Sequence, residues 1–124
     1  MRSQGTGLPG YQGLEVYQRS YGRALEVHRL SATFPGTERT ELGRQLREAT
    51  ESIPADIAEG YGRRGARDRA RFLVMGAGSC EEVQVWLSFA KDLGSLEKER
   101  YEALRASYQE IARMLEGLRK AWSS

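Results

Sequence analysis

Apolar residues recur every three or four positions along four long segments of this chain, which is the period of an α-helix with one buried side. Turn-forming residues separate the segments, namely Pro35 with Gly36, the glycines at 60, 62 and 65, and Gly94. Helices are predicted over about residues 14–31, 38–61 and 66–93, and from Ser95 to near the C-terminus. Four amphipathic helices with short connections favour an all-α fold, an antiparallel up-and-down four-helix bundle.

The two most regular stripes belong to the second and fourth helices. Pro54 falls inside the second stripe and is expected to kink that helix without ending it. Thr37 and Ser95 are the predicted N-caps of these two helices. The predicted buried residues are Leu42, Leu46, Ala49, Ile53 and Ile57 in the second helix, and Tyr101, Leu104, Tyr108, Ile111, Leu115, Leu118 and Trp122 in the fourth.

The first and third helices carry apolar residues on more than one side. In the first helix, Val16, Val27 and Leu30 lie opposite the predicted inner face, either as scattered surface residues or as a subunit contact. The predicted inner faces are Leu14, Tyr17, Tyr21, Ala24, Leu25 and His28 in the first helix, and Phe72, Met75, Gly76, Ser79, Val83, Trp86, Leu87 and Ala90 in the third.

The length of 124 residues suits one bundle domain, 14–124, preceded by a glycine-rich arm, 1–13, that is predicted to be flexible. The single cysteine, Cys80, allows no internal disulfide and fits a reducing compartment. No segment approaches the roughly 20 apolar residues of a membrane-spanning helix. A cytoplasmic location is therefore expected.

Residues that carry most enzyme chemistry are scarce. His28 is the only histidine, and its position on a predicted apolar face indicates a hydrogen-bonded core residue. The chain has no Glu-x-x-His pair of the di-iron bundles, no second cysteine for a zinc site and no phosphate-binding loop of the Walker type. We therefore expect no cofactor, no metal and no catalytic activity.

Polar residues line one edge of the apolar stripe in the helix over 38–61. A structural seam is the favoured interpretation, in which the acidic members pair with Ser79, tyrosines or arginines of a neighbouring helix or subunit. Acid–base chemistry by Asp56 and Glu59 is the alternative. The predicted seam comprises Gln45, Ser52, Asp56, Glu59 and Ser79.

Arginine dominates the basic residues, with 16 Arg against 3 Lys, and five arginines crowd into nine residues after the second helix. Such a cluster is either a solvated corner or a site that grips phosphates without reading sequence. Only Tyr61 and Phe72 interleave the cluster, which argues against a single-strand stacking platform and favours structured RNA or duplex backbone. The candidate nucleic-acid-binding residues are Arg63, Arg64, Arg67, Arg69 and Arg71, with Arg44 and Arg47 as an extension.

Two blocks of sequence, "FPGTERTELGRQLREATESIPADIAEGYGR" and "RFLVMGAGSCEEVQVWL", together resemble the 23S rRNA intervening sequence proteins over about residues 14–118. Two positions depart from the family pattern, with Asp56 in place of Asn and Gly76 in place of the more frequent Ala. The matching positions are Phe34, Pro35, Glu38, Leu42, Gln45, Ser52, Ile53, Ile57, Ala58, Glu59, Gly60, Phe72, Leu73, Gly78, Ser79 and Glu82.

The resemblance implies a non-enzymatic four-helix bundle that assembles as a ring-like homopentamer. A related branch is the accessory variability determinant of diversity-generating retroelements, a basic pentameric barrel that binds a reverse transcriptase and its template RNA. Our hypothesis is an RNA-binding accessory protein that serves a reverse transcriptase or an rRNA intervening sequence. The alternative is a protein-interaction scaffold with no RNA role, whose arginines meet acidic residues of a partner.

Overall fold

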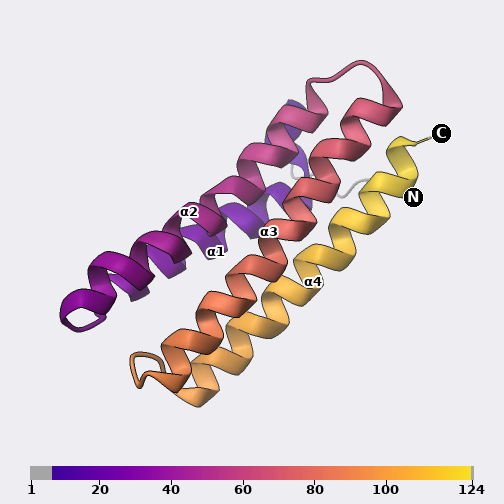
Figure 1. Ribbon diagram of the computed structural model, residues 1–124. Helices are drawn as coiled ribbons and strands as arrows, with labels where there is room; N and C mark the ends of the chain where they lie inside the picture. The colour runs from indigo at the N-terminus through magenta and orange to yellow at the C-terminus, as the bar shows by residue number, and fades with distance from the viewer. Residues whose placement is uncertain (1–6, 124) are drawn as a thin grey trace.

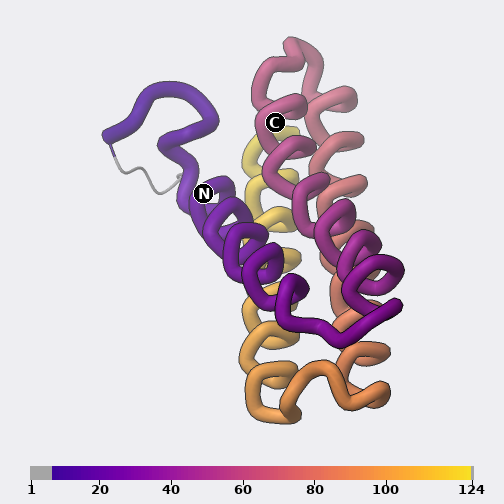
Figure 2. The backbone as a smooth tube through the Cα atoms, turned by 90° about the vertical axis from the view of Figure 1, so that its left-hand side faces the viewer, coloured from indigo at the N-terminus to yellow at the C-terminus, as the bar shows by residue number. Residues whose placement is uncertain are grey.

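The computed structural model describes residues 7–123, which form a short 3-10 helix and four α-helices and contain no strand. The elements are η1 (Gly10–Gly13), α1 (Glu15–Ser31), α2 (Gly36–Tyr61), α3 (Ala66–Asp92) and α4 (Lys98–Trp122). Successive helices pack side by side, and α4 also touches α1 (Figure 1). The chain is the four-helix bundle that the apolar period predicts. Figure 2 shows α1 crossing the other three helices at an angle, so it packs mainly on α2.

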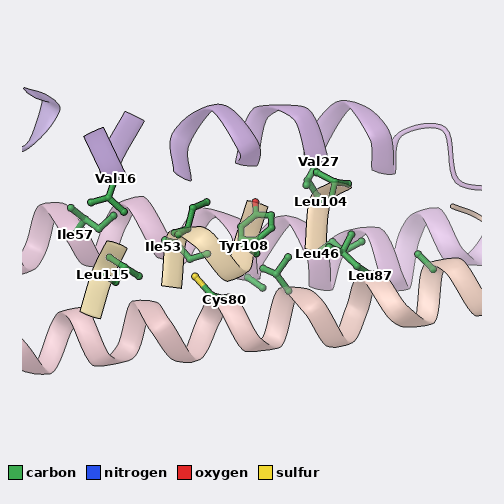
Figure 3. Packing of buried hydrophobic residues seen from close by; sticks show 14 of the residues in the cluster. Val16, Val27, Leu46, Ile53, Ile57, Cys80, Leu87, Leu104, Tyr108 and Leu115 are labelled. Carbon is green, nitrogen blue, oxygen red and sulfur yellow. The ribbon is translucent and has the colours of Figure 1, made fainter. Parts of the chain in front are cut away.

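One core runs the length of the bundle (Figure 3). The α2 stripe is confirmed, because all five predicted residues are buried and Pro54 lies inside a continuous helix. The α4 stripe is confirmed as well, with Leu104, Tyr108 and Ile111 each at most 1% exposed. Burial of such apolar surface is the main contribution to the stability of a bundle of this size.

The buried face of α1 agrees with the prediction only in part, because Leu14 and Ala24 are buried as predicted but Val16 and Val27 from the opposite side are buried too. Val27 is fully buried, whereas Tyr21 is 49% exposed and Leu25 is 41% exposed. The buried face includes Ser20 and Ser31, whose hydroxyls donate to carbonyl oxygens one turn earlier in the helix. Because these small polar residues are satisfied locally, they can be buried at little cost, and a pattern based on large apolar residues misses them.

The predicted inner face of α3 is confirmed for five of its eight residues. Leu73 and Cys80 also enter the core, whereas Met75 is exposed. The five buried residues are Phe72, Gly76, Val83, Leu87 and Ala90. Several apolar residues on the opposite side of α3 also face outward, among them Val85 and Phe89. A helix that is apolar on both sides has no single stripe, so period alone assigns its inner face only in part.

The predicted N-caps are wrong. The α2 helix begins at Gly36 and α4 begins at Lys98, with Pro35 and Glu97 at the capping positions and no side-chain cap on either helix. Ser95 instead donates a hydrogen bond to Glu38 Oε1, which ties the α3–α4 turn to the start of α2.

Part of the predicted flexible arm packs against the bundle. Gly10–Gly13 form η1, and the Tyr11 ring contacts Tyr17 and Tyr61. Residues 1–6 lie outside the described residues.

Candidate nucleic-acid interface

The five clustered arginines lie at the corner where α2 ends, residues 62–65 turn and α3 begins. Gly60 allows the two helices to approach closely there. A Cβ atom on Gly60 would lie 3.1 Å from Phe72 Cβ and 3.3 Å from the Arg69 carbonyl oxygen. The C-terminus of α4 is at the same end of the bundle (Figure 2). We call this region the arginine corner.

Arg69 holds the corner together through backbone contacts. Its guanidinium donates to the carbonyl oxygens of Arg63 at 3.3 Å, Arg64 at 3.1 Å and Trp122 at 3.5 Å. Carbonyl groups near the ends of helices lack intrahelical partners, and a cation is favourable beside them. Arg69 therefore links the α2–α3 turn to the end of α4, and its role is structural.

Replacing Arg69 with Ala is expected to lower the free energy of unfolding by about 2 kcal/mol, because charged hydrogen bonds to three carbonyl oxygens are lost. Arg67→Ala is the matched control, since Arg67 is exposed and its guanidinium has no ion pair within residues 7–123. The control is expected to change stability by less than about 0.5 kcal/mol. Urea denaturation of both variants measures the difference, and equal stabilities would refute the structural role of Arg69.

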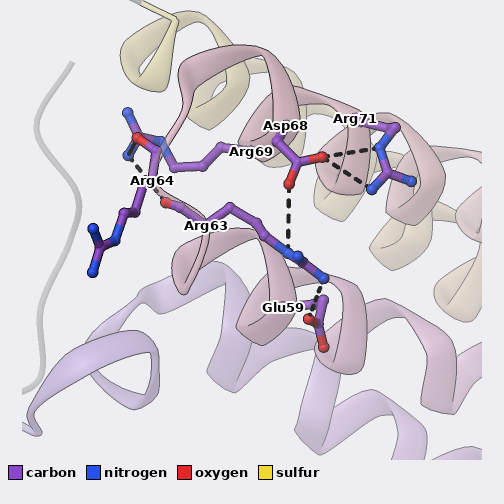
Figure 4. A network of polar contacts seen from close by, with 6 residues as sticks. All are labelled: Glu59, Arg63, Arg64, Asp68, Arg69 and Arg71. Atoms are coloured by element: carbon purple, nitrogen blue, oxygen red, sulfur yellow. Dashed lines mark hydrogen bonds and ion pairs between the residues drawn. The ribbon is translucent and has the colours of Figure 1, made fainter.

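Arg63 and Arg71 are engaged by two carboxylates (Figure 4). Arg63 lies 2.7 Å from Glu59 Oε2 and 3.6 Å from Asp68 Oδ2, and Arg71 lies 3.0 Å from Asp68 Oδ1. Both guanidinium groups also lie over the Phe72 ring, at 4.8 and 4.5 Å from its centroid. The charge of these two arginines is thus partly neutralised inside the protein.

Arg64 and Arg67 are the cations of the corner that remain available. Both are exposed, and neither guanidinium has an ion pair or hydrogen bond among the residues that the structure describes. In Figure 4 the Arg64 side chain points away from Glu59 and Asp68. Five arginines stand against two carboxylates here, which leaves three positive charges at one end of the bundle. An excess of this kind attracts anions although the whole chain carries only +2.

Arg44 and Arg47 do not extend the corner. At 1.5 Å of rise per residue, Arg47 lies about 24 Å before Arg63 along the course of α2. Arg44 pairs with Glu48 at 3.2 Å. Arg47 donates to Ser31 Oγ at 3.0 Å and so fastens α2 to α1.

The predicted polar seam is reduced to one contact between helices, in which Ser52 Oγ donates to Ser79 Oγ at 2.7 Å. Glu59 is exposed and pairs with Arg63 of its own helix end rather than across the bundle. Burial raises the pKa of the half-buried Asp56 carboxyl, and the nearby Glu59 raises it further. Gln45 lies away from this contact, in a groove beside Trp86. Within residues 7–123 no group of three His, Cys, Asp or Glu side chains could hold a metal ion.

A row of aromatic rings ends at the arginine corner. Tyr21, Tyr17, Tyr11, Tyr61 and Trp122 follow one another with centroid separations of 5.9, 5.0, 6.5 and 6.0 Å. The rings come from α1, η1, the end of α2 and the end of α4, so their proximity depends on the fold. In the sequence only Tyr61 and Phe72 lie near the arginines, which is why the sequence argues against a single-strand stacking platform.

Large apolar side chains also project from the outer side of α3. We call this surface the α3 ridge, and its members are Val74, Met75, Val85, Phe89 and Leu93, each exposed by 46–58%. Another apolar surface is a groove between α1 and α2, the α1–α2 groove, lined by Tyr21, Leu25, Pro54 and Ala55 among others. Exposed apolar surfaces of this kind are candidates for interaction with another protein.

The family model described as "23S rRNA-intervening sequence protein" matches residues 12–117. The chain belongs to this family. A similar solved structure is that of a protein of unknown function from the S23 ribosomal protein family of Bacteroides thetaiotaomicron. It aligns with a TM-score of 0.78 and 21% identity, covering 85% of this chain and 95% of that one. No curated protein matches the chain.

Family membership confirms the resemblance carried by the two sequence blocks, and the solved relative shares the fold of this family member. Within residues 7–123, none of the helices combines the length and apolar character needed to cross a bilayer.

Proposed function

We propose that this 23S rRNA-intervening sequence family member is a non-catalytic, oligomeric accessory protein that binds RNA. The observation that carries the proposal is that three arginines of the corner have partners within the protein and two do not. Backbone carbonyl groups bind Arg69, and carboxylates bind Arg63 and Arg71. The corner therefore presents Arg64 and Arg67 without acidic partners among the described residues. Arginines at a turn and a helix start are suited to contact a phosphate backbone in a sequence-independent way.

The family name connects these proteins with 23S rRNA, which supports RNA as the ligand. The role in the cell is then that of an rRNA intervening-sequence protein or of an accessory subunit to the reverse transcriptase of a diversity-generating retroelement. Both roles need an RNA-binding surface and no catalytic group.

Assembly as a ring-like homopentamer completes the proposal. A ring requires two different surfaces on each copy, one to meet the other on its neighbour. The α3 ridge and the α1–α2 groove are two such apolar surfaces, and α2 separates them. Cyclic symmetry would place every copy of the arginine corner at the same height along the ring axis. Weak phosphate contacts by each subunit would then add through avidity.

The test is RNA binding by two matched double variants at one salt concentration. Arg64→Ala with Arg67→Ala is expected to weaken binding about tenfold or more, because two phosphate contacts and the counterion release that accompanies them are lost. Arg39→Ala with Arg105→Ala removes the same charge from two exposed arginines toward the other end of the bundle, neither of which has an ion pair in residues 7–123. Equal losses for both variants would contradict a defined site at the corner.

A protein-interaction scaffold is the second candidate, and the α3 ridge favours it. An apolar helix face of this kind also fits a helix of another protein. On this account the free arginines meet acidic residues of that partner. If the wild-type protein binds no RNA, the scaffold function is favoured over the RNA-binding function.

A further inference from the structure

We propose that the arginine corner binds a single-stranded segment of RNA, with one base stacked on Tyr61 and the adjoining phosphates on Arg64 and Arg67. This inference rests on the proposed function and adds the form of RNA that the site selects. The sequence alone favours structured RNA or a duplex backbone, because Tyr11 and Trp122, which accompany Tyr61 in the fold, are remote from it in the chain.

Tyr61 is placed to act as a stacking surface. It is the last residue of α2, three positions before Arg64, and its side chain is 44% exposed. Tyr11 and Trp122 contact its ring in T-shaped arrangements, with interplanar angles of 68° and 67°. Tyr61 stays 44% exposed although both of these contacts restrain its ring. A ring that is already held loses little conformational entropy when a base stacks on it.

The neighbouring charges identify the ligand. An exposed ring alone would fit many apolar groups, but Tyr61 precedes Arg64 by three positions and Arg67 by six, and both arginines lack acidic partners within residues 7–123. A planar aromatic surface beside unpaired cations matches a nucleotide, which offers a base face and a phosphate a short distance apart. Arg69 links the two features through the backbone, because it donates to the carbonyl oxygens of Arg64 and of Trp122, and the Trp122 ring packs against Tyr61. The phosphate contacts and the stacking surface therefore belong to one rigid unit.

The form of the RNA follows from the stacking requirement. Inside a duplex, each base face is covered by its neighbours, so Tyr61 can reach a base only by disrupting the stack. In a single strand or a loop the base faces are available, and stacking on an aromatic side chain tolerates any base. The corner is thus expected to prefer unpaired segments with little dependence on sequence.

The experiment compares a labelled RNA strand without self-complementarity with the same strand annealed to its complement, using fluorescence anisotropy. Wild type is expected to bind the single strand more tightly than the duplex. Tyr61→Ala is expected to lose at least about fivefold in single-strand affinity and little in duplex affinity. Tyr61→Phe keeps the ring and is expected to bind as wild type does, and thermal melts establish that both variants are folded.

A second measurement does not depend on the Tyr61 variants. In a Trp86→Phe background Trp122 is the only tryptophan, and its fluorescence should be quenched by the single strand and not by the duplex. Equal binding of both forms, or unchanged single-strand affinity in folded Tyr61→Ala, would overturn the single-strand preference while leaving the phosphate site intact. If wild type binds neither form, the proposed RNA function fails and this inference fails with it.

Discussion

If the protein assembles through the α3 ridge as proposed, replacing Val85 and Phe89 together with Arg is expected to yield monomers while each bundle stays folded. Within a single chain these side chains are 50% and 51% exposed, so neither substitution disturbs the core. In a subunit interface the same residues would be buried, and a buried arginine without a partner is strongly unfavourable. The mass of the particle in solution, measured by light scattering, should fall from several subunits to one.

A matched control places two arginines at Ala103 and Ala106, which are exposed on α4 outside the α3 ridge. This variant carries the same added charge and should keep the wild-type mass. Wild type that is already monomeric, or a ridge variant that stays assembled, would be inconsistent with assembly through the α3 ridge. The monomeric variant retains Arg64 and Arg67, so its RNA affinity should fall only by the avidity that assembly supplies.

The second large effect is a loss of stability at alkaline pH that originates at Cys80. The thiol is fully buried, and burial raises its pKa to about 12 from an ordinary value of 9.0, with a smaller contribution from Glu81. Between these two pH values the unfolded chain releases the thiol proton and the folded chain retains it, so the free energy of unfolding falls as pH rises. At about 1.4 kcal/mol per unit, Cys80 accounts for a loss of up to about 4 kcal/mol between pH 9 and 12.

Urea denaturation at pH 7.5 and at pH 10.5 measures this effect. Wild type should be less stable at the higher pH, and Cys80→Ala should show a smaller decrease even though the missing sulfur lowers its stability at both values. Burial also raises the pKa of the Tyr108 hydroxyl, so Tyr108→Phe is a useful companion that removes the phenol and keeps the ring. If Cys80→Ala loses as much stability as wild type over the same interval, the thiol is not the group responsible.

The fold could be predicted in outline because two helices carry a single clear stripe. In α2 and α4 the large apolar residues lie on one side, so period and burial agree. In α1 and α3 they do not. The α1 helix buries Ser20 and Ser31 against its neighbours, and α3 keeps apolar residues outward on the α3 ridge. A stripe that is assigned from hydrophobicity alone follows the large apolar side chains. It is therefore misplaced where some of these side chains are exposed, as Tyr21 and Met75 are.

The sequence located the site, but the roles of its individual arginines could not be predicted. Five arginines in nine residues after a glycine mark the corner, yet they look equivalent in the sequence. Their roles depend on partners from other elements, such as the Trp122 carbonyl for Arg69 and the Phe72 ring for Arg63 and Arg71. The aromatic row could not be predicted for the same reason, because its rings come from segments that are distant in the sequence and adjacent only in the fold.

The salt dependence of RNA binding, compared between wild type and Arg64→Ala with Arg67→Ala, tests the phosphate-binding role of the arginine corner. Affinity of wild type should fall linearly with salt on logarithmic axes, as expected when phosphate contacts release counterions. The double variant should stay folded, bind more weakly and show a shallower slope, by about 0.7–0.9 for each phosphate contact removed. A wild type that binds no RNA, or a double variant with unchanged affinity and slope, would contradict the claim that this corner is a phosphate-binding site.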